Sequence, residues 1–323
     1  MLKSFQLNEY SSLKDVVQDE KIAQIERSLA KDFVLSQMSF HIEEFECPIC
    51  HSDEHTNFFV KWGIKYLRCR HCGSIYAVCS KSFVKAYKED SAIRDFRISK
   101  EYQDDAERMR HTNWVEFLDW LKFRFFRFNG ARSNLVITDF GNRYKGFANL
   151  VIADKMFRKY QLVDSALETD YNVKQSDVEA ADIIIFANRI QQSFDPVADL
   201  AALKPILKND GIIILQSRLG SGFDILTLKG QNDKIFPFEH ILLPSKEALF
   251  TILDEAGYEI LEVTTPGNLD VNYVYSKKDC LLDDNIFTKY MFEHSSPETL
   301  REFQRFLQKN DLSSFVQVIA RKK

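Results

Sequence analysis

Short apolar runs alternate with helical patterns through the second half of the chain. Strand-like runs rich in Leu, Ile and Val occur at residues 134–141, 160–164, 181–188 and 211–217. Helical patterns at 145–157 and 196–207 separate them. Strands that alternate with helices predict a mostly parallel sheet with helices on both faces. Three of the runs are continuously apolar, which is typical of strands buried on both sides.

Two further strands are expected toward the end of the chain. They lie at 258–265 and 314–323, and a helical pattern at 245–257 precedes the first of them. The long segment between the two strands contains another helical pattern, at 296–310. These late strands are candidates for an antiparallel pair at the sheet edge.

The cysteines give the strongest chemical signal. Two Cys-x-x-Cys pairs, separated by 18 residues, consist of Cys47, Cys50, Cys69 and Cys72. Zn²⁺ prefers four soft ligands in a tetrahedron, and each such pair presents two thiolates from one tight turn. A redox dithiol would need only one pair, and disulfides are uncommon in reducing compartments. The spacing therefore predicts a closed, structural zinc ribbon, with two short strands around Trp62-Gly63 and a permissive turn at Gly73.

The remaining N-terminal segments have helical patterns. We expect a helical lead-in over 1–44, the zinc ribbon over 45–80, a helical connector over 81–130 and an α/β domain over 131–323. Asn129-Gly130 should end the connector. Its dense aromatic stripe, which includes Trp114 and Trp120, is expected to pack against the neighbouring domain rather than to hold a ligand.

Composition and charge exclude several classes of protein. With 45% hydrophobic and 28% charged residues, the chain is not disordered, collagen-like or a coiled coil. A net charge of −4 argues against a protein that coats nucleic acid, although residues 61–132 hold 16 Lys and Arg against 9 Asp and Glu. No apolar run approaches the roughly 18 residues of a membrane span, and no signal peptide is evident at the start. We therefore expect a cytoplasmic protein.

Several stretches resemble the class I S-adenosylmethionine-dependent methyltransferases that carry an N-terminal zinc ribbon and are associated with sugar and surface-polysaccharide biosynthesis. The resemblance spans about residues 45–323 and includes the motifs GFDIL, FPFEH and TTPGNLDV in the family's order. It implies an α/β, Rossmann-like sheet, mostly parallel with an antiparallel edge strand. S-adenosylmethionine and a structural Zn²⁺ are the cofactors that it implies.

The resemblance also implies a cofactor site at the ends of the first strands. The candidate cofactor-binding residues are Asp139, Gly141, Arg143, Gly146, Asp164 and Asn188. The first four belong to the turn DFGNRYKG, and Asp164 stands where the family has an acidic residue that binds the ribose hydroxyls. Arg143 and Lys145 replace two glycines of the family, and they could instead bind the phosphates of a nucleotide-sugar. Asp182 follows Asp164 by 18 positions, which is too few for the usual helix and third strand.

Methyl transfer to a hydroxyl requires the acceptor to lose its proton. His240 of FPFEH is the candidate general base, because imidazole titrates near neutrality, and Glu239 is the candidate for orienting its ring. A purely structural role of His240 in the loop is the alternative.

These features favour an S-adenosylmethionine-dependent methyltransferase that O-methylates a sugar or glycan precursor. Its expected partners are a sugar or nucleotide-sugar acceptor and enzymes of glycan synthesis. A catalytically inactive relative that acts as a binding or scaffold protein is the first alternative, because the cofactor turn lacks two glycines. An RNA methyltransferase is the second, supported only by the basic segment 61–132.

Overall fold

The computed structural model describes residues 20–37, 46–142, 144–165, 169–267 and 269–323. The expected helical lead-in over 1–44 lies largely outside these residues, and helix α2 spans Glu20–Ser36 within it. Among the described helices, none has the length and apolar character needed to cross a membrane.

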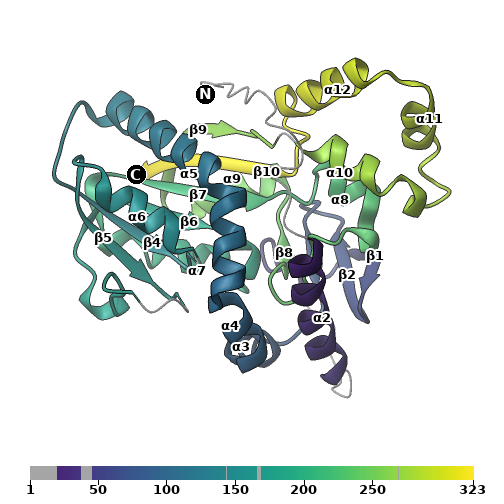
Figure 1. The fold of residues 1–323 in the computed structure, drawn as a ribbon, viewed down its shortest axis with the longest axis horizontal. Helices are drawn as coiled ribbons and strands as arrows, with labels where there is room; N and C mark the ends of the chain where they lie inside the picture. Colours follow the sequence, from purple (N-terminus) through teal and green to yellow (C-terminus); the bar gives the residue numbers. More distant parts are fainter. Residues whose placement is uncertain (1–19, 38–45, 143, 166–168, 268) are drawn as a thin grey trace.

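A six-stranded sheet forms the centre of the molecule, in the order β5-β4-β6-β7-β10-β9 (Figure 1). The strands are β4 (Leu135–Phe140), β5 (Phe157–Val163), β6 (Ala181–Ala187), β7 (Leu207–Arg218), β9 (Tyr258–Thr264) and β10 (Phe315–Lys322). Strands β5, β4, β6 and β7 are parallel, whereas β10 runs antiparallel to both β7 and β9. The predicted mostly parallel α/β sheet is confirmed, and the two late strands form the expected antiparallel pair. The antiparallel strand β10 lies one position inside the edge, with β9 outside it.

Helices cover both faces of this sheet. Along β6, Ile183 and Ile185 join one apolar cluster and Ile184 joins the other, because successive side chains of a strand point to opposite faces. Residues of α5 and α6 belong to the first cluster, and residues of α7 and α9 belong to the second. These helices are α5 (Lys100–Asn129), α6 (Lys145–Ala153), α7 (Pro196–Ala201) and α9 (Lys246–Glu255). The continuous apolar runs of the sequence are thus buried on both sides.

The predicted helical connector consists of three consecutive helices. They are α3 (Lys81–Glu89), α4 (Ser91–Ile98) and α5. The side chains of Ser80, Asp90 and Ser99 each accept a hydrogen bond from a backbone N–H in the first turn and so cap the three N-termini. Gly130, with a φ of 75°, follows the last helix where the sequence predicts its end.

A second sheet, in the order β1-β2-β3-β8, joins the cysteine region to a later part of the chain. Its strands are β1 (His55–Lys61), β2 (Ile64–Cys69), β3 (Ile75–Ala77) and β8 (Leu242–Leu243). The hairpin of β1 and β2 turns at Trp62 and Gly63, whose φ values of 49° and 88° suit a two-residue hairpin loop. The two strands predicted around Trp62-Gly63 are confirmed.

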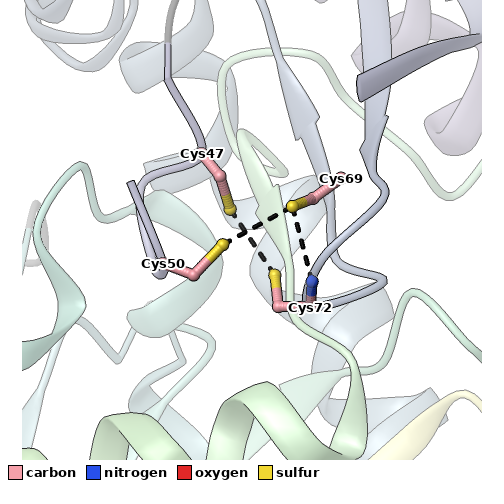
Figure 2. Close-up of side chains that lie close together, drawn as sticks. All are labelled: Cys47, Cys50, Cys69 and Cys72. Carbon is pink, nitrogen blue, oxygen red and sulfur yellow. Dashed lines mark hydrogen bonds between the residues drawn. The ribbon is translucent and has the colours of Figure 1, made fainter. Parts of the chain in front are cut away.

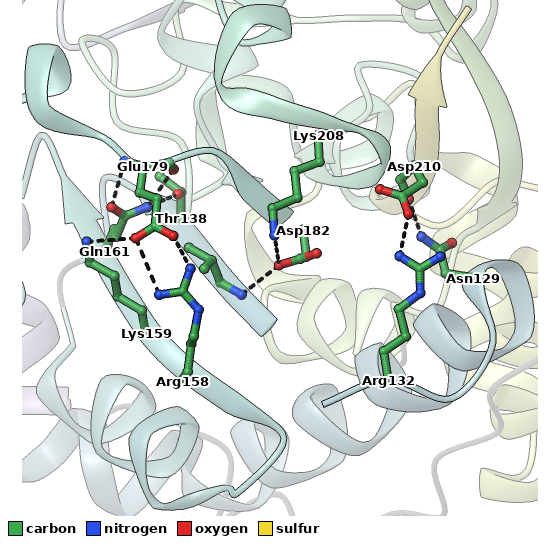
Figure 3. Close-up of polar contacts among 11 residues, drawn as sticks. Asn129, Arg132, Thr138, Arg158, Lys159, Gln161, Glu179, Asp182, Lys208 and Asp210 are labelled. Carbon is green, nitrogen blue, oxygen red and sulfur yellow. Dashed lines mark hydrogen bonds and ion pairs between the residues drawn. The ribbon is translucent and has the colours of Figure 1, made fainter. Parts of the chain in front are cut away.

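The edge strand β5 lacks a full neighbouring strand. Within the described residues between β5 and β6, the pairing is limited to an isolated bridge between Leu162 and Asn172. The Gln161 amide donates to Thr138 Oγ1 and to the Glu179 carbonyl, both at 2.9 Å, and its oxygen accepts from the Glu179 N–H at 2.9 Å (Figure 3). The Gln161 side chain thus fastens the segment around Glu179 to β5 and β4, and the short segment between β5 and β6 forms no full third strand in the described residues, in agreement with the spacing in the sequence.

The remaining helices follow β7 or lie between β9 and β10. They are α8 (Phe223–Leu228), α10 (Asp270–Ser276), α11 (Ile286–His294) and α12 (Pro297–Lys309). Short 3₁₀ turns span Gln175–Asp177, Ile190–Gln192, Lys204–Ile206, Lys229–Gln231 and Lys278–Cys280. Val271, Val274 and Leu307 belong to a third apolar cluster that holds α8, α10, α11 and α12 together.

Candidate functional site

The four predicted metal ligands lie together (Figure 2). Their sulfur atoms are all within 4.8 Å of one another, with Cys47 Sγ 3.5 Å from Cys72 Sγ and Cys50 Sγ 3.5 Å from Cys69 Sγ. A Zn–S distance of about 2.3 Å places the sulfurs of a tetrahedral site roughly 3.8 Å apart. The cluster can therefore hold one Zn²⁺ with four thiolates, which leaves no coordination position for substrate.

Tight turns present these sulfurs. The His51 N–H donates to the Cys47 carbonyl at 3.0 Å, and the Gly73 N–H donates to the Cys69 carbonyl at 3.1 Å. Gly73 has a φ of 73°, a conformation that explains the glycine at this position. Burial raises the pKa of the Cys50 thiol, and a bound cation would favour its thiolate form.

The cysteine region is bonded directly to the segment that follows α8. Strand β3 pairs with β8, and the Ser245 hydroxyl donates to the Cys72 carbonyl at 2.7 Å. On the other side of the small sheet, the buried Lys61 ammonium donates to the carbonyls of Gly230 and Asn232, both at 3.0 Å. The small sheet and its second Cys-x-x-Cys turn thus hold both ends of residues 230–245, one through Lys61 of β1 and the other through Cys72.

The central strand β4 has β5 on one side and β6 on the other, so the chain reverses direction across the sheet at this point. Ligands of open α/β sheets bind at such a switch point, outside the carboxyl ends of the strands. Gly141 follows β4, Asp164 follows β5 and Asn188 follows β6, with φ values of 75°, 55° and 59°. Three of the predicted cofactor residues therefore lie at the ends of three adjacent strands.

Arg189 lies over the turn at Gly141. A Cβ atom at Gly141 would be 3.1 Å from both Cδ and Nη1 of Arg189. The guanidinium donates to Asp164 Oδ2 at 3.1 Å, and the Asp164 side chain remains 51% exposed. Burial, followed by the charge of Arg189, lowers the pKa of Lys88. Sequence reasoning missed Arg189, although its position directly after a predicted strand was a usable signal.

The other predicted cofactor residues have different environments. Asp139 is 3% exposed and accepts a hydrogen bond from the Tyr160 hydroxyl at 2.7 Å. Burial raises the pKa of Asp139 to about 7, against the lowering effect of that hydrogen bond. Gly146 lies beneath α5, where a Cβ atom would be only 1.7 Å from Glu107 Oε2. Arg143 lies outside the described residues.

His240 and Glu239 are both buried in the loop next to β8. The Phe236 N–H donates to His240 Nδ1 at 3.1 Å, so His240 would have to release this bond to accept a proton at Nδ1. The Glu239 carboxylate forms an ion pair with Arg97 and accepts a hydrogen bond from the Tyr87 hydroxyl at 2.9 Å. Arg97 Nε also donates to Glu26 at 2.9 Å, which connects the loop to α2 and α4.

Comparison with known proteins gives similarity of structure only. No family model matches the chain, and no curated protein matches it significantly. One similar solved structure is the plantazolicin methyltransferase BpumL with SAH, at 13% identity and a TM-score of 0.43, covering 74% of this chain and 93% of that one. Another is coclaurine N-methyltransferase bound to N-methylheliamine and SAH, at 14% identity and a TM-score of 0.39, covering 65% of this chain and 72% of that one. A third is the cyclopropane synthase MmaA2 from Mycobacterium tuberculosis, at 12% identity and a TM-score of 0.37, covering 70% of this chain and 88% of that one. Neither substrate nor activity transfers to this chain at such identities.

Proposed function

We propose that the chain is an S-adenosylmethionine-dependent methyltransferase that O-methylates a sugar or glycan precursor. The supporting observation is that the Gly141 turn and the Asp164 carboxylate meet at the switch point of the sheet. The turn has no side chain at Gly141, so a ligand can approach its backbone closely. Asp164 has a carboxylate that can accept hydrogen bonds from both hydroxyls of a ribose.

The proposed cofactor supplies an electrophilic methyl group when it is bound. Gly141 would allow its close approach and Asp164 would hold its ribose, provided that Arg189 turns away from both. Exposed ion pairs contribute only about 0–1 kcal/mol, and Asp164 is half exposed. The pair of Arg189 and Asp164 is therefore a small barrier to ligand entry.

The acceptor hydroxyl must also lose its proton, and His240 is the proposed base. Replacement His240→Ala is expected to lower turnover on a sugar nucleotide by about 10²- to 10⁴-fold, the usual contribution of a general base. An unchanged rate would remove His240 from the mechanism and leave its hydrogen bond with the Phe236 N–H as a structural role.

Binding of S-adenosylhomocysteine tests the proposed function. A ligand that binds only the folded state stabilises it by about 2.7 kcal/mol at 100 times its Kd, so S-adenosylhomocysteine should raise the Tm of the protein. Asp164→Asn should reduce this shift, whereas Asp177→Asn, at an exposed aspartate away from the switch point, should leave it unchanged. Absence of a shift in the unmodified protein refutes the proposed function.

A second candidate is a binding or scaffold protein without methyl transfer, with enzymes of glycan synthesis as proposed partners. Two observations favour it: Arg189 lies over the cofactor turn, and β5 lacks a full third-strand neighbour in the described residues. Arg189→Ala separates the two candidates. Binding of S-adenosylhomocysteine by neither the unmodified protein nor Arg189→Ala supports the scaffold. Binding by Arg189→Ala alone would show that Arg189 closes the site, which also supports the scaffold, and binding by both favours the methyltransferase.

A further inference from the structure

A second group of polar side chains lies where β7 ends. Arg218, the last residue of β7, pairs with Asp224 at 3.4 Å. The Asn232 amide also donates to Asp224, at 3.0 Å, and its oxygen accepts from the Tyr273 hydroxyl at 3.2 Å. The ammonium of Lys234 lies 4.0 Å from the centre of the Tyr273 ring. Strand β7, helices α8 and α10 and the loop after α8 therefore place Lys234 beside Arg218.

Helix α5 contributes a third cation. The Arg110 guanidinium lies 4.8 Å from the ring centre of Tyr144, the residue that precedes α6. Among the described residues, the buried Arg110 Nε and Asp224 Oδ1 have no hydrogen-bond partner. Buried polar atoms normally have one. The Arg110 Nε donor therefore indicates an acceptor, such as an oxygen of an anion, and Asp224 Oδ1 indicates a donor, such as a hydroxyl of the same molecule.

Positive charge exceeds negative charge in this group. Burial lowers the pKa of Lys234 to about 8, and the charges of Arg218 and Arg110 act in the same direction. Asp224 and Asp270 act in the opposite direction. Asp270, however, already accepts hydrogen bonds from both Ser313 and Ser314 and from Gln304, the last at 2.9 Å. An added anion would relieve the repulsion between the three cations.

This group adjoins the switch point on two sides. The Arg218 N–H donates to the side-chain oxygen of Gln191 at 3.2 Å, and Gln191 follows Arg189 by two positions. Tyr144, which stacks with Arg110, follows Gly141 by three positions. A molecule bound here would therefore lie beside a ligand bound at Gly141 and Asp164.

We propose that Arg110, Arg218 and Lys234 form an anion subsite that binds a phosphoryl or carboxylate group of the acceptor substrate. Guanidinium and ammonium groups bind the oxygens of such anions through short, charge-assisted hydrogen bonds. The identification of the anion with the acceptor rests on the proposed function, whereas anion binding itself does not. A sugar phosphate or nucleotide-sugar carries the phosphoryl form of this group, and a sugar acid carries the carboxylate form.

Calorimetric titration of the full, zinc-loaded chain with inorganic phosphate, pyrophosphate and malonate tests the subsite. Arg110→Gln and Lys234→Met should each weaken anion binding about tenfold or more, as expected for loss of a charged hydrogen bond. The matched controls are Arg108→Gln, on the same helix, and Lys278→Met, whose ammonium also lies over a tyrosine ring, 5.2 Å from Tyr275. Both controls should bind as the unmodified protein does. Tighter binding of the phosphates identifies a phosphoryl subsite, and tighter binding of malonate identifies a carboxylate subsite.

Two results would overturn the subsite: no binding of any of the three anions by the unmodified protein, or unchanged affinity in both Arg110→Gln and Lys234→Met. If Lys234→Met does not fold, Arg110→Gln alone decides. S-adenosylhomocysteine binding is measured on the same samples. If the protein binds an anion but not S-adenosylhomocysteine, the proposed methyl transfer is refuted and the anion subsite is retained. If it binds S-adenosylhomocysteine but none of the anions, only the anion subsite is refuted.

Discussion

Asp139 carries a carboxyl group into the interior at the end of β4, where the Tyr160 hydroxyl donates a hydrogen bond to it. Burial raises its pKa to about 7, from an unperturbed value of 3.8. The folded state therefore holds this proton more tightly than the unfolded state does. Protonated Asp139 therefore contributes to the free energy of unfolding. Relative to high pH, this contribution is fully present below pH 3.8 and is lost as the pH rises through about 7.

Asp139→Asn removes this dependence on pH. At pH 8 the variant should be more stable than the unmodified protein by up to about 4 kcal/mol, at about 1.4 kcal/mol per pKa unit, and the gain should shrink toward pH 4. Urea unfolding between pH 4 and 8 measures the difference. Tyr160→Phe serves as the control, because loss of the hydroxyl removes a contact that lowers the pKa of Asp139. A constant difference between Asp139→Asn and the unmodified protein over this range would contradict the raised pKa.

The location of an individual side chain in the fold could be predicted only where it follows from the position of the residue along a strand or helix. Gly141, Asp164 and Asn188 end predicted strands, and parallel strands bring their carboxyl ends to one edge. Arg110 of α5 and Lys234 of the loop after α8 come within electrostatic range of each other only in the folded chain. Neither helical periodicity nor motif spacing contains that contact, so the sequence could not show the proposed anion subsite.

At the scale of elements, Gln161 ties the segment before β6 to the sheet beside its incomplete edge. The spacing between Asp164 and Asp182 predicts too little chain for a third strand, but it does not show what holds the remaining segment against the sheet. Three hydrogen bonds of the Gln161 amide, each 2.9 Å long, answer that question. The connector shows a comparable limit: its helical character was predicted, and its division into three helices depends on caps such as Asp90 and Ser99.

Gln161→Ala should destabilise the protein by about 2 kcal/mol, because the Glu179 N–H and carbonyl and the Thr138 hydroxyl all lose a buried partner. Denaturant unfolding at neutral pH measures this change. Lys159→Ala, on the same strand, is the matched control. It loses an exposed ion pair with Glu179 and should change the stability by about 0–1 kcal/mol. Equal effects of the two substitutions would show that Gln161 does not hold the segment around Glu179 to the sheet.

At the scale of the whole molecule, the four-cysteine region and the α/β fold share structure. The Cys-x-x-Cys spacing predicts the metal cluster, but the pairing of β3 with β8 joins segments about 165 residues apart and has no local signal. Lys61 bonds to the loop near Asn232, and Ser245 bonds to Cys72. The proposed subsite residue Lys234 lies within the same loop. The four-cysteine region therefore supports the candidate substrate side of the molecule through the small sheet and not through the cysteine sulfurs.

Zinc removal should consequently loosen residues 230–245 together with the ribbon. Four thiols without a cation lose the bonds that hold both knuckles, and the folding free energy of such a module comes largely from its metal. After chelation, or in Cys72→Ser, amide hydrogen exchange should accelerate at Leu242 and Leu243 in β8 but not along β4 at the centre of the sheet. Cys280→Ser, at an exposed cysteine outside the cluster, should match the unmodified protein.

Anion affinity, measured with phosphate, should fall in parallel with the loss of protection from exchange, because Lys234 depends on this loop for its position. Rapid exchange confined to the knuckles, with β8 still protected, would show that the loop is held without the metal.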